Sequence, residues 1–208
     1  MPPRVKICGL TNLEDARYCA GAGADYLGFI QYPPSPRYID VPNAAEIIEW
    51  IYGPVCVGVF VDADADTVNR AADMAGFHQV QLHGDEAPEL CTHIDRPVIK
   101  ALSVAPGSTP DDMRFHMDRY APYVDAFLLD THHPTLRGGT GATFDWSVAR
   151  ALSGDYPILL SGGLGAGNVA GAVLAVQPMG VDASSRLEAE PGKKDLPLID
   201  AFFTALCP

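Results

Sequence analysis

The sequence predicts an α/β protein folded as a single (β/α)8 TIM barrel, and three observations support this prediction. Eight short apolar runs recur at intervals of roughly 20 to 30 residues along the 208-residue chain. Most runs are rich in Val, Ile, Leu or Phe without strict alternation, as expected for parallel strands buried on both faces. Helical segments separate the runs, and eight strand–helix modules leave about 26 residues for each, close to the minimum for that unit.

The expected strands coincide with these apolar runs. They are Val5–Cys8, Tyr26–Ile30, Val55–Val61, Gln79–His83, Val98–Leu102, Ala126–Asp130, Ile158–Leu160 and Gly180–Ala183. No linker or low-complexity segment interrupts the series, so we expect residues 1–208 to form one catalytic barrel domain. A doubly wound open sheet is the structural alternative, but its typical five or six strands would leave some modules unused.

Local signals predict helices between the strands. Thr11 and Glu14 have the spacing of a capping box, which predicts a helix with Thr11 as its cap. Pro42 opens a second helical segment, and the alanine- and valine-rich stretch from Asn168 to Gln177 predicts another.

Composition narrows the partners and the compartment. A net charge of −12 argues against a nucleic acid or an anionic membrane surface as partner, and no run of 18 apolar residues predicts a membrane span. The five cysteines show no CxxC spacing, and the N-terminus lacks the apolar region of a signal peptide. We therefore expect reduced thiols, a cytoplasmic location and, because no extra interface element is evident, a monomer.

Polar residues gather at the C-terminal ends of the expected strands, where catalytic groups lie in such barrels. Cys8 ends the first strand and Asp130 the sixth, which suggests an acid/base pair facing a shared pocket. His83 ends the fourth strand and is either a core histidine or part of the pocket wall. Asp182, in the eighth strand, is expected to orient the following loop by hydrogen bonding rather than to transfer protons.

Two loops predict a phosphate site. Gly162 and Gly163 follow the seventh strand, and Ser184 and Ser185 follow the eighth. Barrels often bind a phosphate through backbone N–H groups in these two loops. Neither loop is an ATP or dinucleotide motif, because no complete GxxxxGK[ST] or GxGxxG is present.

The order of strands around a closed barrel places this phosphate site between Asp130 and Cys8. A small anionic sugar phosphate held there would have a carboxyl group on one side and a thiol on the other, which suits proton transfer. Arg37, in the proline-rich loop after the second strand, is a candidate to bind a carboxylate through two N–H groups. Gly139 lies in a third glycine-rich loop, residues 137–141, which is expected to fold over the ligand as a lid.

Nine segments resemble the phosphoribosylanthranilate isomerase family, and they occur in family order from residue 6 to residue 195. They are Lys6–Asn12, Tyr32–Ile39, Gly58–Val61, Val80–Gly84, Leu129–Thr131, Gly138–Trp146, Leu160–Leu164, Val181–Ser185 and Pro191–Asp195. Each segment is modest evidence by itself, but together they are highly specific and cover essentially the whole chain.

The adjacent histidines His132 and His133 have no third ligand at a suitable spacing, so no metal site is expected. The resemblance implies a cofactor-free Amadori rearrangement in tryptophan biosynthesis. N-(5'-phosphoribosyl)anthranilate would become 1-(2-carboxyphenylamino)-1-deoxyribulose 5-phosphate. By motif, Asp130 would be the general acid that protonates the ribose ring oxygen, and Cys8, as a thiolate, would remove the C2' proton. Arg37 would contact the anthranilate carboxylate, and the two loops after strands 7 and 8 would hold the phosphate.

The thiolate role predicts a lowered pKa for Cys8, because a free thiol is mostly protonated at neutral pH. Lys6 shares the face of Cys8 on the first strand and is a candidate cause. Three positions depart from the commonest family pattern: Arg186 follows the serine pair, Gln31 follows the second strand and Ala142 follows the lid loop. Arg186 is expected either to reshape the phosphate loop or to add a guanidinium to it.

Three alternatives remain at this point. A related or bifunctional isomerase of histidine biosynthesis would be expected to carry aspartates at the ends of strands 1 and 5, where this chain has Cys8 and Leu102. An indole-glycerol-phosphate synthase would need a catalytic lysine and a longer N-terminus. A non-catalytic phosphate-binding barrel would bind the ligand without turnover.

Overall fold

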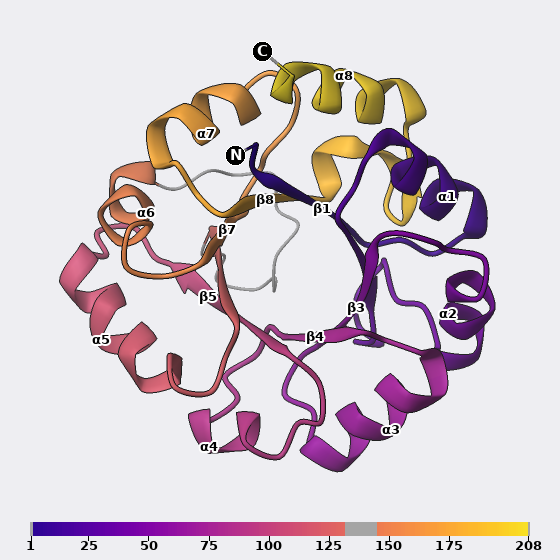
Figure 1. Cartoon of the computed structure of the whole chain (residues 1–208), viewed down its shortest axis with the longest axis horizontal. Coiled ribbons are helices and arrows are strands. Elements are labelled where there is room, and N and C mark those ends of the chain that lie inside the picture. Colours follow the sequence, from indigo (N-terminus) through magenta and orange to yellow (C-terminus); the bar gives the residue numbers. More distant parts are fainter. Residues whose placement is uncertain (1, 132–144, 208) are drawn as a thin grey trace.

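The computed structural model describes residues 2–131 and 145–207, and in it eight parallel strands close into a barrel in the order β1 to β8 (Figure 1). The predicted (β/α)8 fold is confirmed. The strands are β1 Arg4–Cys8, β2 Tyr26–Ile30, β3 Val55–Phe60, β4 Gln79–Leu82, β5 Val98–Val104, β6 Ala126–Thr131, β7 Ile158–Leu160 and β8 Gly180–Ala183. Each lies at its predicted place, and the largest difference is β5, which continues two residues past Leu102.

Helices surround the barrel and follow the strands in turn (Figure 1). They are α1 Leu13–Ala22, α2 Val41–Ile48, α3 Ala65–Ala75, α4 Pro88–Cys91, α5 Pro110–Tyr120, α6 Trp146–Leu152, α7 Val169–Val176 and α8 Leu196–Leu206. The helix predicted from Asn168 to Gln177 corresponds to α7, with those two residues as its caps. None of the described helices has the length and hydropathy needed to cross a membrane.

The capping residue of α1 differs from the prediction. Asn12, not Thr11, is the N-cap, and its side-chain oxygen accepts a hydrogen bond from the Asp15 N–H at 2.8 Å. Thr11 instead donates its hydroxyl to the carbonyl of Gly192, 181 positions along the chain. The hydroxyl of Thr11, which the local pattern predicted as the cap, is therefore engaged in a long-range hydrogen bond instead.

The hydrophobic core has two layers, because successive side chains of each strand point inward and outward in turn. Outward residues pack against the helices and form the larger cluster, which includes Ile7, Leu27, Phe60 and Phe127. A smaller cluster fills the barrel interior and consists of Tyr26, Val57, Ile99, Ala101, Ala126, Leu128 and Leu159. This inner cluster fills the barrel beneath the C-terminal ends of the strands.

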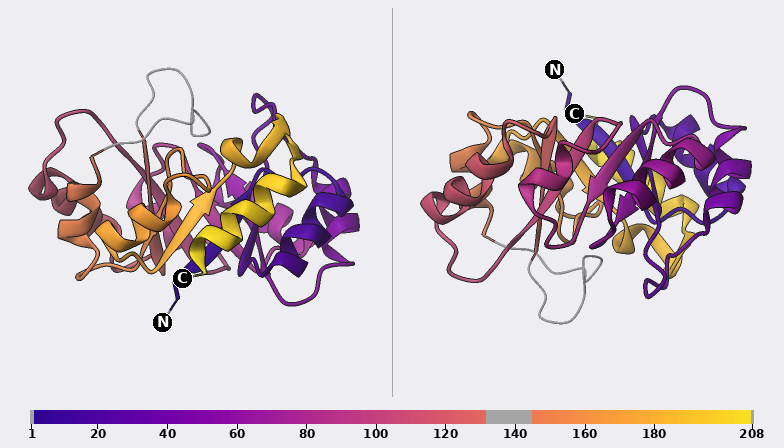
Figure 2. Two further views of the ribbon diagram at one scale, coloured as in Figure 1. Left: turned by 90° about the horizontal axis from the view of Figure 1, so that it is seen from above. Right: turned by 90° about the horizontal axis from the view of Figure 1, so that it is seen from below.

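An excursion between β8 and α8 lies over the end of the barrel. It consists of a short 3₁₀ helix, Ser185–Leu187, and an antiparallel pair, β9 Glu188–Glu190 and β10 Lys193–Lys194. The Lys194 N–H donates to the Asp15 carboxylate at 2.7 Å, which fastens this hairpin to α1. Figure 2 shows the hairpin on one face of the barrel and both chain ends on the opposite face.

Candidate active site

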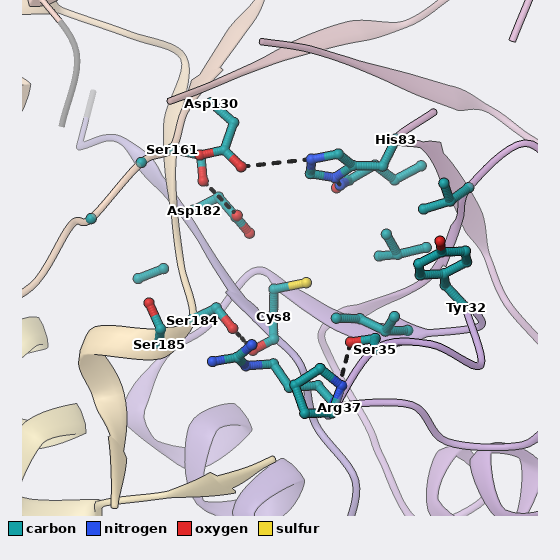
Figure 3. Close-up of a pocket in the computed structure, with 18 of the residues that line it drawn as sticks. Cys8, Tyr32, Ser35, Arg37, His83, Asp130, Ser161, Asp182, Ser184 and Ser185 are labelled. Atoms are coloured by element: carbon teal, nitrogen blue, oxygen red, sulfur yellow. Dashed lines mark hydrogen bonds and ion pairs between the residues drawn. The ribbon is translucent and has the colours of Figure 1, made fainter. Parts of the chain in front are cut away.

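A single pocket at the C-terminal ends of the strands contains every predicted site residue that the structure describes. These are Cys8, Arg37, His83, Asp130, Gly162, Gly163, Asp182, Ser184 and Ser185. Figure 3 shows Asp130 and His83 on one side of the cavity and Cys8 and Arg37 on another. Gly139, the proposed lid and Ala142 lie outside the described residues. The histidine pair 132–133 lies there too, and the described part of the chain holds no group of three metal-binding side chains.

The thiol of Cys8 fits because its neighbour on β2 has no side chain. Cys8 is paired in register with Gly28. A Cβ atom at position 28 would lie 2.7 Å from the Cys8 Sγ and 3.2 Å from its Cα, well inside van der Waals contact. Gly28 therefore fixes the space in which the thiol turns toward the pocket.

Burial raises the pKa of the Cys8 thiol, so the predicted lowering is wrong. The Lys6 and Lys194 ammonium groups act to lower this pKa, whereas the Asp182 carboxylate acts to raise it. The cations offset only part of the desolvation cost of a buried thiolate. Cys8 rests as a neutral thiol at pH 7.

Lys6 forms an ion pair with Asp182 inside the barrel, so its charge does not act on the Cys8 thiol alone. Its Nζ lies 2.7 Å from Asp182 Oδ1, and the second carboxylate oxygen of Asp182 accepts from the Ser161 hydroxyl at 3.0 Å. Lys6 is fully buried, and a buried charge needs such a partner. These bonds join β1, β8 and the loop after β7 rather than the loop after β8, so the orienting role expected for Asp182 in that loop stays a prediction.

Asp130 is buried at the end of β6 and faces a histidine. Its Oδ1 accepts the Thr131 N–H at 2.8 Å, and its Oδ2 lies 3.6 Å from His83 Nε2. The Gln81 side-chain amide nitrogen lies 2.7 Å from His83 Nδ1, and the other ring nitrogen, Nε2, faces Asp130. His83 therefore belongs to the pocket wall, the second of the two alternatives.

The loop after β7 has a shape that only glycine adopts easily. Gly162 and Gly163 have φ values of 90° and 63°, and a Cβ at Gly162 would collide with the side chain of Thr131. Asn168 fixes the loop by accepting the Gly165 N–H at 2.8 Å and donating to the Gly163 carbonyl at 3.0 Å. The backbone can thus come close to an anion.

The neighbouring loop after β8 connects back to β1. The Ser184 hydroxyl donates to the Cys8 carbonyl at 3.0 Å, and Ser185 lines the pocket beside it. The Arg186 side chain lies along Gly165, where an added Cβ would be 3.2 Å from the arginine Cβ. Arg186 therefore packs beside the two loops, and it is not among the residues that line the pocket.

Arg37 carries a partner that the sequence did not reveal. Glu188 of β9 accepts from Arg37 Nε at 2.9 Å and from Nη2 at 2.8 Å, in a two-pronged ion pair. Glu188 in turn accepts from the Lys194 ammonium at 2.8 Å. The sequence indicates Lys194 only through its position in the Pro191–Asp195 segment, which resembles the family but suggests no role for the lysine. Glu188 lies outside all nine segments.

One wall of the pocket is largely apolar. It is formed by Ile30, Tyr32, Pro34, Pro36, Val59 and Val61. Gln31, the polar departure at the end of β2, turns away and donates to the Ile39 carbonyl at 3.0 Å. The cavity thus joins an apolar wall to a thiol, a carboxyl group, a guanidinium and an anion-compatible loop, which suits acid/base chemistry on an aromatic sugar phosphate.

Comparison with known proteins decides the family. Residues 5–205 match the family model for N-(5'-phosphoribosyl)anthranilate (PRA) isomerase. The chain belongs to the phosphoribosylanthranilate isomerase family. An isomerase of this name from Pelobacter propionicus is 45% identical over 200 residues, which cover 96% of this chain and 93% of the relative.

Solved phosphoribosylanthranilate isomerases have the same fold. The Thermotoga maritima enzyme has 41% sequence identity and a TM-score of 0.89, with 98% of each chain covered. Another solved member, at 39% identity, TM-score 0.85 and 98% coverage of each chain, is in complex with reduced 1-(o-carboxyphenylamino)-1-deoxyribulose 5-phosphate.

Proposed function

We propose that this chain converts N-(5'-phosphoribosyl)anthranilate to 1-(2-carboxyphenylamino)-1-deoxyribulose 5-phosphate in tryptophan biosynthesis, with Asp130 as acid and Cys8 as base. The observation that carries the assignment is the position of both side chains around one pocket, with the loops after β7 and β8 between them. Membership of the isomerase family supports the reaction. A carboxyl group and a thiol supply the proton transfers, so the proposed chemistry needs no cofactor.

The proposed reaction has two proton transfers. Asp130 in its acid form gives a proton to the ribose ring oxygen, the bond from C1' to that oxygen breaks, and the nitrogen lone pair forms a Schiff base. The Cys8 thiolate then takes the proton from C2', and the released electron pair forms an enolamine. Tautomerisation of the enolamine gives the C2' ketone.

The proposed binding mode uses both ends of the pocket. The backbone around Gly162 and Gly163, with Ser184 and Ser185, would hold the phosphate. The guanidinium edge of Arg37 that Glu188 leaves free would bind the anthranilate carboxylate. The apolar wall from β2, β3 and the proline-rich loop would take the aromatic ring.

We also propose that residues 1–208 form one domain that acts as a monomer in the cytoplasm. One chain supplies the acid, the base and both anion contacts, so a second copy is not needed to complete the pocket. Light scattering coupled to gel filtration measures the mass directly. A mass of twice 22.2 kDa would contradict the monomer.

Turnover tests the function against the alternative of a non-catalytic phosphate-binding barrel. The purified protein is mixed with freshly generated phosphoribosylanthranilate, and loss of substrate fluorescence is followed against a blank. Catalysed loss with formation of the ketose product supports the proposal. Saturable binding without turnover would instead support the binding module.

The pH dependence should reveal the buried thiol. The reaction needs the carboxylic acid of Asp130 and the thiolate of Cys8 together, so kcat/KM should be level between the pKa values of the two groups and fall at higher pH. Because burial raises the Cys8 pKa, we expect this basic limb to lie above the ordinary cysteine value of about 8.5. Measurement of kcat/KM in overlapping buffers from neutral to alkaline pH checks this. A basic limb that is complete below pH 7 would contradict it.

Gly28→Ala should reduce activity without removing any reacting group. The new Cβ would lie 2.7 Å from the Cys8 Sγ, so the thiol must move. Displacement of a reacting atom by about 1 Å can cost about 100-fold in rate, and we expect a loss in kcat/KM of that order. Gly21→Ala is the matched control, because a Cβ there has no atom within 4 Å, and it should retain full activity. Equal rates for both variants would contradict the role of Gly28.

A further inference from the structure

Lys194 is a buried cation that no step of the reaction uses. Its side chain is fully buried, and its Nζ donates to three oxygens: the Cys8 carbonyl at 2.7 Å, the Ser184 carbonyl at 3.4 Å and Glu188 Oε1 at 2.8 Å. An ammonium group has three protons, so each has an acceptor. The ammonium therefore ties the ends of β1 and β8 to the carboxylate of β9.

Glu188 links the Lys194 ammonium group to the guanidinium of Arg37. Its carboxylate lies between two cations, with Lys194 on one oxygen and the Arg37 fork spanning both. Burial acts to raise the pKa of Glu188, but Arg37 and Lys194 outweigh it and the pKa stays below its usual value. Glu188 is therefore an anion that directs the guanidinium, whose Nη1 edge is left for a second carboxylate.

We propose that Lys194 and Glu188 are positioning residues that hold the catalytic thiol of Cys8 and the carboxylate-binding Arg37 in a fixed mutual arrangement. Neither of the two lines the pocket, so they act through Cys8 and Arg37. This inference rests on the proposed function, because it assigns Cys8 and Arg37 their partners in the substrate. It adds the β9–β10 hairpin to the parts of the fold that catalysis needs.

The hairpin is hydrogen-bonded to the chain next to the thiol at two points. Gly192 at its turn accepts the Thr11 hydroxyl, and the Lys194 backbone N–H is bonded to Asp15. Both partners belong to the segment that directly follows β1. The ammonium is thus fixed to the same stretch of chain as the thiol, and the Glu188 carboxylate is held between the Lys194 and Arg37 cations.

The two residues should leave different kinetic signatures. Glu188→Gln keeps the shape but removes the charge that orients Arg37, so we expect KM to rise about tenfold with kcat within twofold of wild type. Lys194→Met also removes a positive charge near the thiol. The charged groups that face Cys8 are Lys6 from β1, Asp182 from β8 and Lys194 from β10.

Alkylation of Cys8 separates this effect from general loss of structure. Iodoacetamide labelling of residue 8 is measured by peptide mass spectrometry between pH 6 and pH 11 in the wild type and the variants. Because Lys194 stabilises the thiolate, Lys194→Met should move the labelling curve to higher pH, whereas Glu188→Gln should leave it nearly in place. Lys194→Arg, which keeps the charge, should return the curve toward that of the wild type.

Matched controls exist for both substitutions. Lys193→Met changes the adjacent lysine, whose side chain is exposed, and Asp73→Asn changes a carboxylate paired with Arg96 on the surface. Both should give wild-type KM and wild-type labelling curves. An unchanged KM in Glu188→Gln, or a Lys194→Met labelling curve that superimposes on the wild type, overturns the proposal. If Lys194→Met does not fold, the KM of Glu188→Gln and the labelling curve of Lys194→Gln decide.

Failure of the proposed function would be seen separately. A wild-type protein without isomerase turnover would refute the reaction assigned above. The labelling curves need no substrate and would still report whether Lys194 acts on Cys8.

Discussion

Asp130→Asn is expected to lower kcat/KM by about 10²- to 10⁴-fold, the range that a positioned general acid contributes. Asparagine has nearly the shape of aspartate and can still accept the Thr131 N–H, but it has no acidic proton for the ribose ring oxygen. The loss should therefore come from chemistry rather than from folding. Initial rates of fluorescence loss at low substrate concentration give kcat/KM directly.

Asp73→Asn provides the comparison for this variant. Asp73 is exposed on α3, where it pairs with Arg96, so the same chemical change there should leave the rate unchanged. A thermal melt of both variants would show whether the fold is retained. An Asp130→Asn enzyme within a few fold of the wild type would exclude Asp130 as the acid.

Cys8→Ser is expected to have an effect at the upper end of the same range, about 10³- to 10⁴-fold in kcat/KM. A serine hydroxyl is a much weaker acid than a thiol and stays protonated throughout the accessible pH range, so no base remains at C2'. The basic limb of the pH profile should disappear with the activity. Single-wavelength kinetics from pH 6 to pH 10 measure both effects.

Cys207→Ser is the control for the thiol. Cys207 is exposed after α8, and its substitution should change neither the rate nor the pH profile. Retention of the basic limb in Cys8→Ser would show that another group titrates there and would remove Cys8 from the mechanism.

The strands and the positions of the polar pocket residues could be predicted because both follow from local sequence. An apolar run such as Ile158–Leu160 is stable only as a buried strand. Because all the strands are parallel, the polar residues that end such runs lie together at the C-terminal end of the barrel. The positions of Cys8 and Asp130 in the pocket follow from this rule.

The ion pairs behind the pocket could not be predicted, since their partners are far apart in the chain. Arg37 and Glu188 are separated by 151 positions, and Lys194 and the carbonyl of Cys8 by 186. No periodicity or spacing encodes such a pairing. The cap of α1 was assigned to the wrong residue for the same reason, because a distant carbonyl takes the Thr11 hydroxyl.

The predicted direction of the Cys8 pKa shift is wrong because charged residues can be read from a sequence more readily than the burial of a side chain. Lys6 was visible as a cation on the same face of the strand, and it does act to lower the pKa. The depth of the thiol in the barrel, which acts more strongly in the opposite direction, depends on how every other strand closes around it.

The bonds that Lys194 makes to the first strand also set an order of events during synthesis. The thiol of Cys8 is synthesised well before its partners, because the Lys194 cation and the Glu188 carboxylate follow it by 186 and 180 residues. A nascent chain that has folded β1 to β7 still lacks the seam between β8 and β1. Catalytic competence should therefore arrive in one late step, and a chain that stops translation before residue 194 should be inactive however much of its barrel has formed.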